Sequence, residues 1–200
     1  MKPIEAAIRA DASRNRAALL VAAEAEFAEH GPSASIADIA RRAGVAKGTV
    51  FRHFPTKEDL IASIVCEHVA TLADAARRLA GAPDPGGALL DFLTIAADHR
   101  RRHDLTFMQS ASNGDPRVAT AFADLHAGLE TLVSRARSSG AIRADITEAD
   151  VFLLMCAPIH IVDNLPAPEP LLWQRYLAII LDGLRVEGAH PLPHPAPIVQ

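Results

Sequence analysis

Apolar residues recur at helical spacing along most of the chain. In the segment 11–30, Ala17, Leu20 and Phe27 mark one helical face, and Gly31-Pro32 ends the pattern. Similar spacing predicts short helices at 35–43 and 46–54, and further helices at 56–79, 88–103, 104–112, 117–138, 147–162 and 171–186. Pro158 is expected to kink the helix at 147–162. We therefore predict an all-α chain of about nine helices.

The composition of the chain supports this fold class. Of its 200 residues, 50% are hydrophobic but only 4% are aromatic, and a chain rich in Ala and Leu favours helices over strands. Cys66 and Cys156 both lie in apolar helical runs, which excludes a disulfide scaffold and indicates a reducing compartment. The sequence shows neither a signal peptide nor an uninterrupted apolar stretch of about 18 residues. We therefore expect a cytoplasmic protein without a membrane span.

Charge is distributed unevenly along the chain. Residues 1–57 contain nine Lys and Arg and six acidic residues, a net charge of +3. The remainder contains 11 basic and 18 acidic residues, a net charge of −7, and the whole chain carries −4. A basic N-terminal part on an acidic body suggests that an anionic partner meets the N-terminal part.

The segment 35–60 contains a helix-turn-helix pattern. Ser35 can cap a short helix, Gly44 suits a left-handed turn, and a second short helix follows. Apolar side chains can fill the wedge between the two helices: Ile39, Ala40, Val45 and Val50. Polar side chains would lie on the outer faces of the second helix: Lys47, Thr49, Arg52 and His53. This spacing places Lys47 at the helix N-terminus, where phosphate oxygens bind.

This segment closely resembles the DNA-binding head of the TetR family of bacterial repressors. The matching runs are Ile36-Ala37-Asp38-Ile39-Ala40, Ala43-Gly44-Val45, Lys47-Gly48-Thr49 and Phe51-Arg52-His53-Phe54-Pro55-Thr56-Lys57-Glu58-Asp59-Leu60. The resemblance covers roughly residues 12–65 and implies an N-terminal three-helix head, joined by a long fourth helix to a C-terminal ligand-binding and dimerisation body. On this basis we expect a DNA-binding domain at 1–57 and a ligand-binding and dimerisation domain at 58–200.

The resemblance also implies how the head meets DNA. The helix Ala46–Phe54 would enter the major groove of a palindromic operator, with half-sites of a dimer about 34–36 Å apart. Residues carried over as DNA contacts are Ser35, Lys47, Gly48, Thr49, Phe51, Arg52, His53 and Lys57. The family often has Tyr where this chain has Phe51, so that a phosphate hydrogen bond is replaced here by packing. Contacts by Arg14, Arg16, Arg41 and Arg42 are left open.

The C-terminal body is expected to bind a small hydrophobic effector and a second copy of the chain. The runs within Thr147–Val162 and Leu171–Val186 are apolar on most faces, which favours burial against another copy; the resemblance likewise implies dimers paired through the last two helices. Large side chains with a few polar groups are the candidates for an effector pocket: Phe92, His103, Phe107, Met108, Phe122, His126, Met155 and His160. The chain is therefore interpreted as a ligand-responsive dimeric regulator, most simply a repressor.

Two other interpretations compete with this one. His99 and His103 stand four residues apart on a predicted helix, a spacing that can hold one metal ion, so a helical metal-dependent enzyme is an alternative. Because Arg100-Arg101-Arg102 between them repels a cation, we predict no metal site. The sequence also lacks a nucleophile elbow, a phosphate-cradling loop and a dinucleotide fingerprint, so we predict no cofactor and no catalytic residue. Phe51 and the modest charge of the head leave a second alternative, an interaction module that does not bind DNA.

Overall fold

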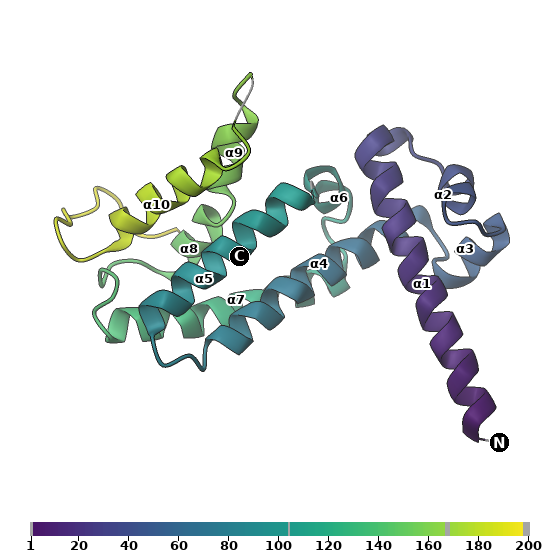
Figure 1. Cartoon of the computed structure of the whole chain (residues 1–200), viewed down its shortest axis with the longest axis horizontal. Helices are drawn as coiled ribbons and strands as arrows, with labels where there is room; N and C mark the ends of the chain where they lie inside the picture. The colour runs from purple at the N-terminus through teal and green to yellow at the C-terminus, as the bar shows by residue number, and fades with distance from the viewer. Residues whose placement is uncertain (1, 104, 167–168, 198–200) are drawn as a thin grey trace. The chain divides into compact units, whose positions relative to one another are not determined.

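The computed structural model describes residues 2–103, 105–166 and 169–197, and within these residues the chain is helical and contains no strand (Figure 1). The predicted all-α fold is confirmed. The described residues form two compact units. Unit 1 comprises residues 2–67 and 105–118, and unit 2 comprises residues 68–103, 119–166 and 169–197. Two long helices contribute residues to both units, α4 (Lys57–Leu79) and α7 (Pro116–Ser138).

Unit 1 contains the predicted helix-turn-helix. Besides the first part of α4 and the start of α7, this unit comprises α1 (Lys2–His30), the 3-10 turn η1 (Gly31–Ser33), α2 (Ile36–Arg42), α3 (Lys47–His53) and α6 (Thr106–Ala111). The helices α2 and α3 form the helix-turn-helix. Apolar side chains of α1, α2, α3 and α4 make its core, and the most buried include Leu19, Ile39, Val50, Phe54 and Leu60. The helix expected at 11–30 begins earlier, at Lys2, because Pro3 in the first turn costs no backbone hydrogen bond.

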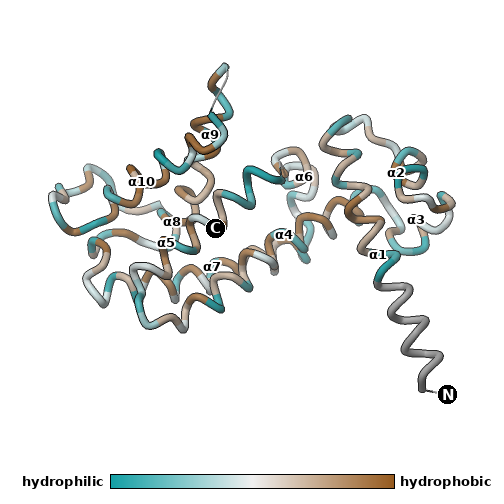
Figure 2. The backbone as a smooth tube through the Cα atoms, in the orientation of Figure 1, coloured by the Kyte–Doolittle hydropathy of each residue, from teal (hydrophilic) through white to brown (hydrophobic). Residues whose placement is uncertain are grey.

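Unit 2 contains the remaining helices, α5 (Pro85–Arg102), α8 (Glu148–Leu154), α9 (Ala157–Asp163) and α10 (Leu172–Leu184). Hydrophobic positions alternate with hydrophilic ones along α4, α7 and α10, as expected for helices that bury one face (Figure 2). Phe92 and Leu129 are among the residues fully buried in its core. Gly128 brings α7 close to α4, because a Cβ atom there would lie 2.9 Å from that of Ala76.

The helix caps predicted from the sequence are confirmed. The hydroxyl of Ser35 accepts the backbone N–H of Asp38 at 3.2 Å, and that of Thr147 takes part in a capping box with Asp150. Asp84 caps α5 by accepting the N–H of Gly87 at 3.0 Å. This cap explains why α5 begins at Pro85 and not at residue 88.

The helix expected at 147–162 is divided into two. Residues 155–156 form a turn between α8 and α9, and Pro158 lies in the first turn of α9. A proline inside a continuous helix removes one backbone hydrogen bond and its ring clashes with the carbonyl four residues earlier. Here these effects break the helix where we expected a kink. None of the described helices is long and apolar enough to cross a membrane.

Candidate nucleic-acid interface

The turn between α2 and α3 has the tight geometry that the sequence predicts. Gly44 adopts a φ of 68°, in the left-handed region that favours glycine. The N–H of Val45 donates to the carbonyl of Ala40 at 3.0 Å, which closes the turn. Ile39 and Val50 are fully buried on the inner faces of the two helices. This packing fixes which side of α3 faces outward.

The outer side of α3 presents positive charge, an aromatic ring and open backbone. Lys47 and Arg52 are exposed, and the ring of Phe51 is 42% exposed. The Nζ atom of Lys47 lies 5.7 Å from the centre of the Phe51 ring, so that the two side chains share one surface. A Cβ atom added at Gly48 would meet no atom within 4 Å, which leaves the backbone of α3 accessible there.

Lys57, which we expected to hold phosphate, is bound within the head. Its ammonium group donates to the carbonyl of Pro32 at 2.8 Å and to that of Ala34 at 2.7 Å. The same group lies 5.5 Å from the centre of the Phe27 ring. Lys57 therefore ties the start of α4 to the segment between α1 and α2, and one of its three donors remains for a phosphate.

Three other predicted contacts, Ser35, Thr49 and His53, lie in partly buried positions. Besides accepting the N–H of Asp38, the hydroxyl of Ser35 donates to the carboxylate of Asp38 at 2.5 Å. That hydrogen bond is the main cause of the lowered pKa of Asp38. The Nε2 atom of His53 is buried and has no hydrogen-bond partner among the described residues. A DNA contact through this atom would therefore require the ring to turn outward.

The arginines whose role the sequence left open take different positions. Arg42 donates from Nε to Glu26 at 2.7 Å and from Nη1 to Glu29 at 2.8 Å, and thereby joins α2 to α1. The hydrogen bond to Arg42 is the main cause of the lowered pKa of Glu29. Arg16 pairs with Glu67 at 2.8 Å and lies over the ring of Phe54. Arg41 is exposed and pairs with Asp38 at 2.7 Å.

The eight residues predicted to line an effector pocket are divided between the two units. Phe107 and Met108 belong to unit 1. The ring centre of Phe107 lies 6.2 Å from that of Phe27. In unit 2, Phe92 and Met155 are buried and His160 is exposed.

Two more of these predicted residues form a small aromatic group in unit 2. Phe122 and His126 pack on Phe152, with ring centres 6.1 and 4.4 Å away. The Nδ1 atom of His126 lies 3.1 Å from the carboxylate of Glu148. Aromatic faces beside a polar pair are the features that we expected of an effector pocket wall.

A hollow of about 510 Å³ lies elsewhere in unit 2, against the start of α5, the segment at 141–142 and α10. None of the eight predicted residues lines it. Its wall is apolar at Leu89, Ile142 and Leu181, whereas Asp182 and Arg185 supply charge. Sequence reasoning missed it because the helix spacing alone does not show which faces leave a space between them.

The last helices and the segments beside them expose many apolar side chains. Of the ten large apolar residues exposed among the described side chains, six lie between residues 153 and 186. They are Leu153, Ile161, Leu165, Leu171, Ile179 and Val186. Clustered apolar exposure marks an interaction site more often than an isolated exposed residue does.

The two cysteines are protected thiols. Burial raises the pKa of both Cys66 and Cys156, which keeps them protonated and poorly reactive.

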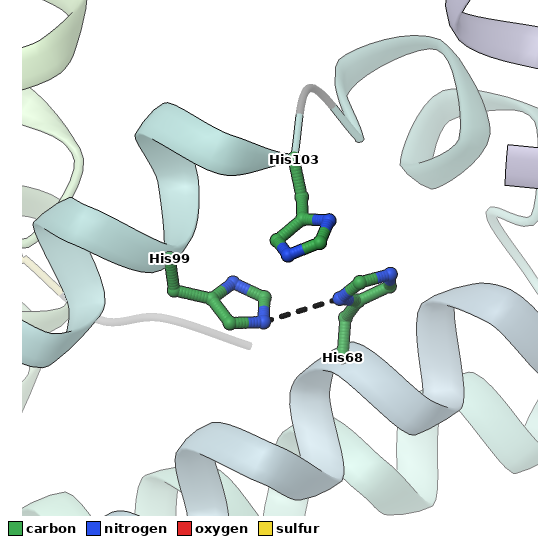
Figure 3. Close-up of side chains that lie close together, drawn as sticks. All are labelled: His68, His99 and His103. Carbon is green, nitrogen blue, oxygen red and sulfur yellow. Dashed lines mark hydrogen bonds between the residues drawn. The ribbon is translucent and has the colours of Figure 1, made fainter. Parts of the chain in front are cut away.

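A group of three histidines lies in unit 2. His99 and His103, both at the end of α5, lie beside His68 of α4, which was not predicted (Figure 3). The third histidine lies 31 residues before His99, and no local spacing could have indicated it.

Comparisons with known proteins agree with this geometry. Residues 19–64 match the family model of bacterial regulatory proteins of the tetR family, and residues 84–186 match that of the C-terminal domain of SbtR-like transcriptional regulators. The crystal structure of a TetR transcription regulatory protein from Mycobacterium vanbaalenii is 34% identical, with a TM-score of 0.65 over 90% of this chain and 99% of that one.

Two further relatives extend the comparison. The HTH-type transcriptional repressor Rv3405c of Mycobacterium tuberculosis is 52% identical over 56 residues, which span 28% of this chain and 29% of the relative. A structure described as the molecular basis for control of antibiotic production by bacterial hormones is 30% identical, with a TM-score of 0.65 over 86% of this chain and 98% of that one.

The all-helical fold and the exposed outer side of α3 are those of a helix-turn-helix transcriptional regulator. The chain belongs to the TetR family of bacterial transcriptional regulators.

Proposed function

We propose that this protein is a homodimeric repressor that binds a palindromic operator through α3 and leaves it when a small hydrophobic effector binds unit 2. The observation that supports DNA binding best is the outer side of α3. It carries Lys47 and Arg52 beside the exposed ring of Phe51, and its backbone is open at Gly48. Lys47 lies at the start of α3 and Arg52 in its last turn. Two cationic side chains along a helix with accessible backbone are suited to phosphates and base edges in a major groove.

The DNA contacts proposed are those that the sequence predicted: Ser35, Lys47, Gly48, Thr49, Phe51, Arg52, His53 and Lys57. Among them, Lys47, Gly48, Phe51 and Arg52 carry the proposal, because all four are exposed. The corresponding functional domains are residues 1–57 for DNA and residues 58–200 for effector binding and dimerisation. In this scheme Arg42 is a structural residue, since Glu26 and Glu29 bind its guanidinium group.

For the effector we propose a molecule with an apolar body and a polar end. Phe122 and His126, packed on Phe152, remain the best supported of the predicted lining residues, and the hollow beside α10 is the competing location. A relative described in connection with bacterial hormones is compatible with a small-molecule effector. Phe122→Leu and Leu181→Ala distinguish the two locations, because only the variant in the true wall changes the effector concentration that releases DNA.

The first experiment is a selection from random duplex DNA with the full-length protein, followed by titration of the selected site at several salt concentrations. We expect a palindrome, and a steep fall of affinity with salt. Lys47→Ala should weaken binding and reduce the salt slope by about two, one for each subunit of the dimer. Arg78→Ala, which removes one exposed charge of α4 in unit 2, is the matched control and should change neither. Failure of the folded protein to select any site would contradict the proposal.

A further inference from the structure

Three imidazole rings meet in unit 2. His68 lies on α4, His99 lies in the last turn of α5, and His103 caps the end of α5. The three rings surround a common space in Figure 3. Each ring offers one nitrogen atom, and these three atoms all lie within 4.8 Å of one another. We propose that His68, His99 and His103 together bind a divalent transition-metal ion of the kind that imidazole prefers, such as Zn²⁺.

The separations between the rings are close to those of a formed metal site. With metal–nitrogen bonds of about 2.0 Å in a tetrahedral arrangement, two ligand nitrogens lie about 3.3 Å apart. The Nδ1 atom of His68 already lies 3.1 Å from the Nε2 atom of His99. The ring centre of His103 lies 4.4 Å from that of His68 and 4.9 Å from that of His99. Rotation of the side chains supplies the remaining movement, which is about an ångström.

The ligand set selects the class of ion. Neutral imidazole suits zinc, copper and nickel, whereas calcium and magnesium require oxygen ligands that this set does not offer. Three imidazoles leave one position of a tetrahedral ion for water or another small ligand. The contact between His68 and His99 places a proton on one of the two facing nitrogens. When the ion binds, it displaces that proton, because a ring nitrogen that binds a metal ion carries none.

The positive charge beside the site is partly compensated, because one carboxylate, Asp98, stands against the three arginines at 100–102. Asp98 pairs with both Arg101, at 2.9 Å, and Arg102. In addition, α5 ends at Arg102, and the carbonyl end of a helix favours a cation. The arginine run, which led us to predict no metal site, is therefore a weaker obstacle than its sequence suggests.

The described residues contain a second group that could hold an ion, Glu26, Glu29 and His30 in unit 1. There Arg42 already donates to both carboxylates, and His30 pairs with Glu26 at 3.0 Å. An ion would have to displace a guanidinium group. The histidine group of unit 2 is therefore the preferred site, and His30 supplies a control for it.

The test uses Co²⁺ as a probe, since tetrahedral Co²⁺ absorbs visible light strongly. Full-length protein without a histidine tag is freed of metal and titrated with Co²⁺, and then Zn²⁺ is added. We expect saturation at one ion per chain and loss of the absorption as Zn²⁺ replaces Co²⁺. His68→Gln and His99→Gln should each weaken Co²⁺ binding by about 100-fold or more, because each removes a direct ligand.

His30→Gln is the matched control and should bind Co²⁺ as the wild type does. Circular dichroism and thermal unfolding establish that each variant is folded. The X-ray absorption spectrum of the Zn²⁺ complex gives an independent measurement on the wild type and should show three imidazole ligands. The proposal is overturned if the wild type does not saturate, if His99→Gln binds normally, or if His30→Gln alone loses binding. These outcomes are independent of DNA binding, because no operator is present.

Discussion

At Gly48, substitution by alanine is expected to affect stability and DNA binding in opposite directions. In the free protein a Cβ atom at this position meets nothing within 4 Å, and alanine favours a helix by up to about 1 kcal/mol over glycine. We therefore expect Gly48→Ala to keep or raise the melting temperature while it lowers operator affinity at least about tenfold, a loss of about 1.4 kcal/mol. Thermal unfolding and fluorescence anisotropy measure the two effects. A variant that binds the operator normally would show that DNA does not approach this backbone closely.

Phe51 is the residue where this chain departs from the family pattern that it otherwise matches. Its ring is 42% exposed and lies beside Lys47. A hydroxyl added at the ring would reach solvent and could donate to a phosphate. We expect Phe51→Tyr to tighten operator binding by about 1 kcal/mol, roughly fivefold, with no change in stability. Phe51→Leu is the control that removes the ring without adding a donor. Equal affinities of the wild type and the Tyr variant would mean that no phosphate lies within reach.

Lys47 and Lys57 carry the same charge in the same head but have different surroundings. Lys57 donates to two backbone carbonyls near the end of α1, and Lys47 only covers an exposed ring. Lys57→Ala should therefore lower the free energy of unfolding by about 1 kcal/mol or more, because charged hydrogen bonds to those carbonyls are lost. Lys47→Ala should leave it unchanged. Chemical denaturation of both variants makes the comparison, and equal stabilities would show that the contacts of Lys57 contribute nothing.

At the scale of elements, one arginine joins the first two helices of the head. Arg42 of α2 holds Glu26 and Glu29 of α1, and the pKa of Glu29 lies below its ordinary value of 4.5, chiefly because of the hydrogen bond from Arg42. A carboxyl group whose pKa is lowered by folding stabilises the fold above its unfolded pKa. That stabilisation is lost as the pH falls through the lowered value.

Arg42→Ala should therefore melt at a lower temperature than the wild type at pH 7, and this difference should shrink as the pH falls below about 4.5. Melting curves between pH 7 and pH 3 follow the effect. Arg41→Ala is the control, since Arg41 pairs only with Asp38, whose low pKa is due mainly to Ser35. A difference that stays constant over this pH range would rule out Glu29 as its source.

Most elements could be predicted from the sequence because their determinants are local. Ser35, Gly44 and Thr147 each act on backbone within a few residues, and all three have the predicted geometry. For α8 and α9, the sequence predicted the position of the interruption, at Pro158, but not that the helix ends there. Whether a helix bends or breaks at a proline depends on what packs around it. The exposed side of α3 follows from the burial of Val50, a local pattern also.

At the scale of the whole molecule, local patterns give less information. The predicted pocket residues were chosen by size and chemistry, and the structure divides them between the two units. The histidine group needed His68, which a separate helix brings to His99. Spacing within one helix shows which residues share a face, but not which faces of distant helices meet. The dimer surface stays a prediction, made because helices that are apolar on most faces favour burial against a partner.

The exposed apolar side chains of α8–α10 lead to a prediction about assembly. Ile179 is 54% exposed on α10. In the homodimer that we propose, a second copy of the chain buries it. Ile179→Glu should shift the protein from dimer to monomer in sedimentation analysis, because an unpaired carboxylate is costly to bury. Operator affinity should fall with it, since a monomer contacts one half-site. Val21→Glu makes the same change at a residue of α1 that is 70% exposed, and should leave the dimer intact. If Ile179→Glu stays dimeric, the copies meet through another surface, and the apolar face of α10 is left for the effector or another partner.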